Sequence, residues 1–131
     1  MNWQNYLLVG LGGFIGANIR YIVGNLVGRM LGIGFPYGTF IINITGSFIL
    51  GLFSTLALRL GWWDGWRLIV AVGFVGAYTT FSTFEYETLR LLVDGQRWEA
   101  ASMNIVGSVV FGLGAAGLGV VMADVLLRWR A

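Results

Sequence analysis

Four long apolar segments, separated by short polar turns, dominate the pattern of this chain. We expect membrane-spanning helices over residues 3–30, 37–58, 66–92 and 98–125, because about 20 apolar residues cross the hydrocarbon core of a bilayer. The first segment has no charge before Arg20, and residues 30–58 have none at all. The pattern predicts an all-α membrane protein with a single transmembrane domain over residues 1–131.

Glycines recur four residues apart in the first span, at Gly12 and Gly16 and again at Gly24 and Gly28. Small residues at this spacing let helix backbones approach closely, which is how helices associate in lipid. We therefore interpret both pairs as packing positions. Arg20 lies at the far end of the uncharged stretch, where it either snorkels to the interface or has a structural or anion-attracting role.

The third span contains an unusual stretch, residues 73–84, which begins with two glycines and then places four hydroxyl side chains in five positions. Gly73 and Gly76 each weaken a helix by about 1 kcal/mol relative to alanine. Nearby Thr and Ser side chains can satisfy backbone groups that a break exposes. The composition predicts a third helix that is broken near its middle and lies inside protein or beside a watery cavity.

Polar side chains recur at helical spacing on three of the spans, and the two phenylalanines after the break share a face. The positions are Thr39, Asn43, Ser47 and Ser54 in the second span, Thr79, Thr83, Glu87, Phe81 and Phe84 in the third, and Asn104 and Ser108 in the fourth. Polar groups in a membrane are expected to face protein or water. Hydrogen bonding between helices would explain the hydroxyls, and plain packing would explain the phenylalanines.

The chemistry of these positions points to an ion, of either sign. Amides, hydroxyls and the positive ring edges of Phe81 and Phe84 suit a small anion. No arginine or lysine lies at mid-span, where a fixed charge would hold an anion too tightly. Backbone carbonyls freed near Gly76 and Thr79 would instead suit a cation such as sodium.

Composition excludes several function classes. Hydrophobic residues make up 57% of the chain and charged residues 11%, against about 25% charged residues in soluble domains. Without cysteine or histidine, the chain has neither the usual transition-metal ligands nor a Cys or His nucleophile, so we expect no enzyme. A net charge of +2 is too small to indicate nucleic-acid binding. The N-terminal residues lack the basic segment of a secretory signal, so we expect the first span to be retained.

The basic residues, all of them arginine, are balanced between the two sides of the expected spans. An even number of spans puts both termini on one side, with Arg59, Arg67, Arg128 and Arg130, against Arg29, Arg90, Arg97 and, depending on its depth, Arg20 on the other. Arginine bias normally sets the orientation of a membrane protein. A balanced chain can insert either way round, which predicts that two copies pair as an antiparallel homodimer.

One block of the sequence is highly specific: residues 76–84 are GAYTTFSTF, and Glu87 follows shortly after. Agreement extends to residues 12–17, 20–21, 36–39 and 43 and, more loosely, to residues 104–108. In this order, and over nearly the whole chain, the sequence resembles the Fluc (CrcB) family of fluoride channels.

The resemblance implies a dual-topology homodimer in the cell (inner) membrane, through whose two pores fluoride leaves a microbial cell passively and so protects it. It implies that Phe81 and Phe84 line the pores and that Asn43 donates its amide to fluoride. A polar track would be formed by Thr39, Ser82, Thr83, Glu87, Asn104 and Ser108.

The resemblance also implies a central structural sodium ion (Na+), held by the backbone carbonyls of Gly76 and Thr79 from both copies. Some members have a tyrosine where this chain has Ala100, so we expect the outer end of the polar track to be built differently here.

Two other functions have different signatures. A small dual-topology multidrug exporter would share the size and the balanced charge, but it needs a carboxylate in the membrane, typically in the first span. The first span has no acidic residue. A membrane subunit without transport activity would explain the glycines but would leave the polar positions on three helices unexplained.

Overall fold

The computed structural model describes residues 2–129, which form helices joined by short turns. Four helical stretches are long and apolar enough to cross a membrane: Trp3–Leu31, Tyr37–Leu60, Asp64–Val93 and Trp98–Arg128. The predicted all-α membrane protein with four spans is thus confirmed. The helix ends lie close to the expected span ends, while the single transmembrane domain over residues 1–131 stays a prediction.

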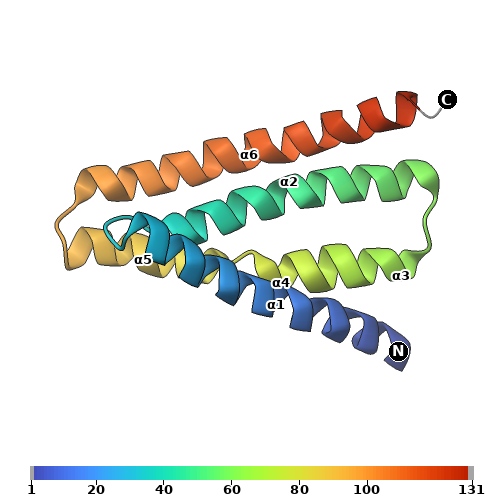
Figure 1. The fold of residues 1–131 in the computed structure, drawn as a ribbon, viewed down its shortest axis with the longest axis horizontal. Helices are drawn as coiled ribbons and strands as arrows, with labels where there is room; N and C mark the ends of the chain where they lie inside the picture. Colours follow the sequence, from blue (N-terminus) through green and yellow to red (C-terminus); the bar gives the residue numbers. More distant parts are fainter. Residues whose placement is uncertain (1, 130–131) are drawn as a thin grey trace.

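The third span consists of several pieces, whereas the other three spans are single helices. The order is α1 (Trp3–Leu31), α2 (Tyr37–Leu60), α3 (Asp64–Trp66), the π-helical η1 (Arg67–Val75), α4 (Gly76–Tyr78), α5 (Phe81–Val93) and α6 (Trp98–Arg128). Figure 1 shows α2 and α6 running side by side, while α1 crosses the third span. The start of α1 and the end of α6 lie at the same end of the molecule (Figure 1).

Local chemistry explains where α1 begins and where α1 and α2 end. The Asn2 side chain accepts a hydrogen bond from the Gln4 N–H at 3.1 Å and so caps α1. Gly32 and Gly61 end α1 and α2 with φ of +81° and +60°, a region that costs glycine little. The connections between the spans are short, and successive spans run antiparallel (Figure 1).

The glycines of α1 pack as the sequence predicts, with one exception. A β-carbon at Gly12 or Gly16 would overlap the backbone of the third span, at the carbonyls of Ile69 and Phe74 respectively. Gly24 faces α2, since a β-carbon on Gly38 would lie 3.2 Å from the Gly24 Cα. A β-carbon at Gly28, in contrast, would meet no atom within 4 Å among the residues that the structure describes.

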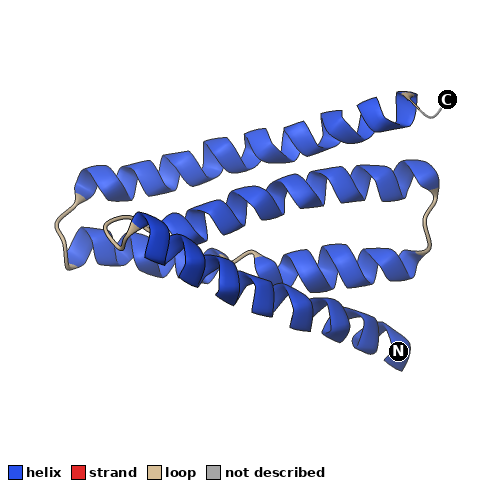
Figure 2. Cartoon of the chain, in the orientation of Figure 1, coloured by secondary structure: helices blue, strands red, loops and turns tan. Residues whose placement is uncertain are grey.

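The third helix is broken near its middle, as predicted, but the break does not lie at the glycines. Gly76 is helical, with φ −60° and ψ −34°, and Gly73 lies within η1. The chain becomes extended only at Thr79 (φ −76°, ψ 157°) and Thr80 (φ −152°, ψ 112°). Figure 2 shows this break as a short loop inside the third span.

Gly73 does not break the helix, as its low helix propensity would indicate, but packs against α1. A β-carbon there would lie 2.6 Å from the Val9 carbonyl and 3.0 Å from the Gly12 Cα. Gly12 and Gly73 thus let α1 and η1 approach backbone to backbone. This contact brings α1, and Arg20 on it, up to the break.

Most of the arginines lie near the two ends of the helices. Arg59, Arg67 and Arg128 belong to the end at which α1 begins, while Arg29, Arg90 and Arg97 belong to the other end (Figure 1). Two arginines are paired, Arg59 with Asp124 at 3.4 Å and Arg90 with Asp94 at 2.8 Å. Arg130 lies outside the described residues.

We predict that Gly12→Ala lowers the free energy of unfolding by about 1–3 kcal/mol, because overpacking forces the two backbones apart. Thermal unfolding in detergent would measure it. Gly10→Ala is the matched control, since a β-carbon at Gly10 meets no atom within 4 Å. Equal stability of the two variants would contradict the packing role of Gly12.

Candidate functional site

Two grooves flank the break in the third span and share the lining residue Thr80. The first groove, of about 1000 Å³, lies between α1, α2 and α5 and includes Arg20, Thr39, Thr83 and Glu87. The second groove, of about 290 Å³, is lined from α2, the third span and α6 by residues that include Asn43, Ser47, Thr79, Phe81, Phe84 and Ser108. The polar positions of three spans, distant in sequence, therefore meet at the break.

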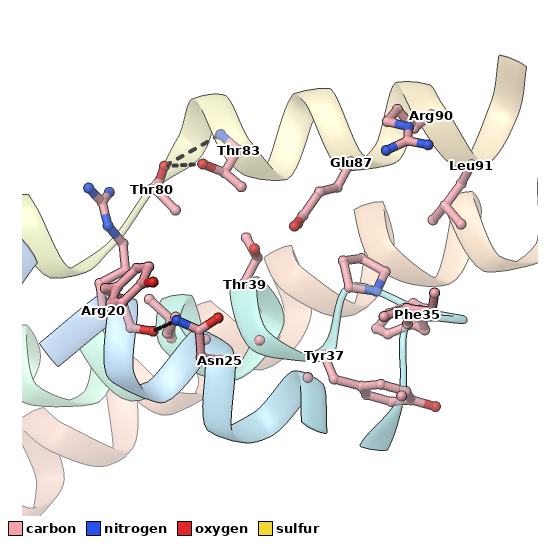
Figure 3. A pocket seen from close by; sticks show the side chains of 18 of the residues that line it. Arg20, Asn25, Phe35, Tyr37, Thr39, Thr80, Thr83, Glu87, Arg90 and Leu91 are labelled. Carbon is pink, nitrogen blue, oxygen red and sulfur yellow. Dashed lines mark hydrogen bonds between the residues drawn. The ribbon is translucent and has the colours of Figure 1, made fainter. Parts of the chain in front are cut away.

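In the first groove, Glu87 extends from α5 toward Thr39 of α2 (Figure 3). The Glu87 Oε2 atom is buried and has no hydrogen-bond partner among the described residues. Thr39 is itself buried. A buried carboxylate oxygen without a partner is rare in proteins and indicates a position that faces water or a ligand.

Two arginines beyond Glu87 are engaged at the mouth of the first groove. Arg90 pairs with Asp94 one turn later at 2.8 Å. Arg97 donates a hydrogen bond to the carbonyl of Gly34. This bond joins the turn after α1 to the turn before α6. The bond from Arg97 thus connects the two turns at this end of the groove, and Figure 3 shows Arg90 among the residues that line it.

Arg20 reaches from α1 to the break. Its Nη1 donates to the Thr79 carbonyl at 3.5 Å, and its side chain also lines the first groove. This long hydrogen bond places a positive charge beside the extended segment. The structural or anion-attracting role of Arg20 stays a prediction.

In the second groove, the Asn43 amide pairs with the backbone of Thr80. The Thr80 N–H donates to the Asn43 Oδ1 at 2.9 Å, and the Asn43 Nδ2 donates to the Thr80 carbonyl at 3.2 Å. Two antiparallel strands pair in the same way, through the N–H and the C=O of one residue. Asn43 therefore lies in the second groove and contacts the break directly.

Phe81 and Phe84 both line the second groove, on the face that their spacing predicts. Their ring centroids are 5.6 Å apart and the ring planes are inclined at 35°. Phe81 is 71% exposed in the single chain. Ser108 approaches the same groove from α6.

Asn104 does not line either groove. It is 1% exposed, and its Nδ2 donates to the Thr88 Oγ1 at 2.8 Å. Thr88 in turn donates to the Phe84 carbonyl at 2.7 Å, while the Ser108 hydroxyl donates to the Asn104 Oδ1 at 3.5 Å. Asn104 thus connects α6 to α5 and holds Ser108, rather than facing the grooves itself.

Other predicted positions are also placed differently. Ser82 and Ser54 are exposed and line neither groove, and Gly76 is likewise outside both. Thr79 is the first extended residue of the break and Thr83 follows the break, so the two do not form a stripe on one helix. Ser47 lines the second groove, but its hydroxyl donates to the Asn43 carbonyl of its own helix at 2.8 Å.

Sequence reasoning missed three residues, Tyr78 and Thr80 at the break and Thr88 further along α5. Thr80 caps α5 by accepting from the Thr83 N–H at 3.4 Å. The hydroxyl of Tyr78, which is 5% exposed, is 2.9 Å from the Thr45 hydroxyl. Thr88, the third, lies four residues after Phe84 and on its helical face, a spacing that could have indicated it.

Comparison with known proteins covers almost the whole chain. A family described as CrcB-like protein, Camphor Resistance (CrcB), matches residues 7–120. A protein of Acidobacterium capsulatum named fluoride-specific ion channel FluC is 48% identical over 122 residues, which cover 92% of this chain and 97% of that one. Proteins with the same name from Sulfurihydrogenibium sp. and Solibacter usitatus are 44% and 42% identical and cover 94% and 92% of this chain, and 99% and 98% of their own.

We predict that Thr88→Val lowers the free energy of unfolding by about 1–3 kcal/mol, because the buried Asn104 amide loses its acceptor. Thr88→Ser keeps the hydroxyl and is expected to cost less. Thermal unfolding of both variants in detergent measures the difference. A serine variant as unstable as the valine variant would contradict this role of the hydroxyl.

Proposed function

The chain belongs to the CrcB-like family, and on this premise we propose that it is a fluoride-specific ion channel. As a member of a channel family and a multi-pass membrane protein, it is not an enzyme. We propose that fluoride passes down its gradient, out of a microbial cell and across its inner membrane. The observation that supports this proposal most strongly is the second groove, which gathers Asn43, Phe81, Phe84 and Ser108 at the break.

The chemistry of the second groove suits fluoride. Fluoride is small, strongly hydrated and a strong hydrogen-bond acceptor, so passage costs several kcal/mol for each lost hydrogen bond that is not replaced. Amide and hydroxyl donors can replace water, and phenylalanine ring edges carry a partial positive charge. All described residues that line this groove are uncharged. A neutral lining binds an anion weakly enough for it to leave.

We further propose that the first groove is the entrance to the path. It meets the second groove at Thr80 and contains the positive charge of Arg20. Thr39, Thr83 and Glu87 line it and would continue the polar track, with the unpartnered Glu87 oxygen accepting from water. Asn104 would act on this track indirectly, by holding Ser108.

The working channel is proposed to be an antiparallel homodimer with two pores. In a single chain the second groove is open, and Phe81 is 71% exposed beside it. A second copy against this face would close the groove and cover Phe81 and Ser82. The balanced arginines at the two ends of the helices allow that copy to insert the other way round.

A central structural Na+ is compatible with the backbone at the break. The Thr80 N–H donates to Asn43, so the Gly76 carbonyl does not accept the helical bond from Thr80 that it would accept in an unbroken helix. Among residues 2–129, the only partner of the Thr79 carbonyl is Arg20, through the long bond. Two carbonyls from each copy would hold the ion at the dimer axis, and its charge would bind the two breaks together.

Efflux from liposomes tests the channel. We predict that the reconstituted protein releases fluoride rapidly but not chloride, and that Phe81→Ile lowers fluoride efflux at least about ten-fold, equivalent to about 1.4 kcal/mol at the barrier. Phe14→Ile is the matched control, since Phe14 is as exposed as Phe81 and lies outside both grooves. Absence of fluoride efflux from folded dimers would refute the channel, and unchanged efflux in Phe81→Ile would remove Phe81 from the path.

The sodium site has a test that does not depend on transport. An ion that binds only to the folded dimer raises the melting temperature of the dimer as the ion concentration rises. We predict this rise with Na+ and not with N-methylglucamine at equal ionic strength. The same melting temperature in both salts would argue against a Na+ site at Gly76 and Thr79.

A further inference from the structure

A helix break inside a membrane leaves backbone groups without partners. Each unsatisfied N–H or C=O in the hydrocarbon region costs several kcal/mol, so irregular backbone persists there only where other groups satisfy it. Thr80 is the fully extended residue of this break. Among the described residues, the Asn43 side chain is the partner of both its N–H and its carbonyl.

The same stretch of α2 also fits the two residues before Thr80. The Thr45 hydroxyl is 2.9 Å from the Tyr78 hydroxyl, and Tyr78 stacks on Phe74 with ring planes 6° apart. Gly46 leaves room for the Thr79 side chain, because a β-carbon there would overlap the Thr79 methyl group. Residues 43–46 are therefore shaped to receive the break at residues 78–80.

We propose that Asn43 is a positioning residue, whose two hydrogen bonds to Thr80 hold the break in one geometry. We call this pair of bonds the Asn43 clamp. It fixes the residue directly before Phe81, and so the point at which α5 and its ring pair begin. The clamp itself is a feature of the fold. Only its effect on fluoride passage, through the placement of Phe81 and Phe84, rests on the proposed channel function.

The clamp limits what Asn43 offers an ion. Its Oδ1 accepts from the Thr80 N–H, and one of its two amide hydrogens is donated to the Thr80 carbonyl. One N–H is left for fluoride. A residue that only lined the pore would leave the backbone at residues 79–84 unchanged when it was replaced, whereas loss of the clamp loosens that backbone.

Hydrogen exchange of the reconstituted dimer separates these two roles. In Asn43→Ala we expect exchange of the amides of residues 79–84 to rise at least about ten-fold, with exchange in α6 unchanged. Ser47→Ala is the matched control, because Ser47 lines the same groove but bonds within its own helix. Exchange at residues 79–84 equal to that of the parent, or raised equally throughout the chain, would overturn the clamp.

A second variant tests the same bond without changing Asn43, in case Asn43→Ala does not fold. A backbone ester at Thr80 removes its N–H and keeps its side chain. We expect it to raise exchange at residues 81–84 about ten-fold, and an ester at Phe81 to do so less, because the first N–H groups of a helix lack intrahelical partners. Equal exchange in the two esters would overturn the clamp.

Fluoride efflux of the parent protein is measured in the same preparation. Raised exchange in Asn43→Ala together with a parent that releases no fluoride would support the clamp and refute the channel. Unchanged exchange in Asn43→Ala together with rapid fluoride efflux of the parent would refute the clamp and support the channel. The two proposals therefore fail by different measurements.

Discussion

The structure depends on one requirement, that every backbone N–H and C=O inside a bilayer has a partner. Three spans meet it as continuous helices. The third span is interrupted at Thr79 and Thr80, where Asn43 of α2 bonds to both backbone groups of Thr80 and Arg20 of α1 donates to the Thr79 carbonyl. The break is therefore a product of its neighbours as much as of its own sequence.

Close backbone packing brings these neighbours within reach. Gly12, Gly16 and Gly73 remove the side chains that would separate α1 from the third span, and Gly46 does the same between α2 and Thr79. An arginine or an asparagine can then contact the extended segment directly. Small residues at the helix contacts thus determine how closely the Arg20 and Asn43 donors approach the break.

The two grooves differ in the charge of the residues that line them. The first contains arginines and acidic residues, whereas the residues that line the second are uncharged. This order suits an ion that is attracted at an entrance and then held only by weak donors and ring edges. The two serines that line the second groove are both bonded within their own helices, because Ser47 donates to the Asn43 carbonyl and Ser108 donates to the Asn104 side chain.

The sequence by itself determined the four spans, the broken third helix, the shared face of Phe81 and Phe84 and the family, because hydrophobic length, helical spacing and a specific block are local features. It could not place the break at Thr79 and Thr80 instead of the glycines, bury Asn104 against Thr88, or divide the polar residues between two grooves. Those outcomes depend on which donor of one helix reaches which acceptor of another, and only the packing of the helices decides that.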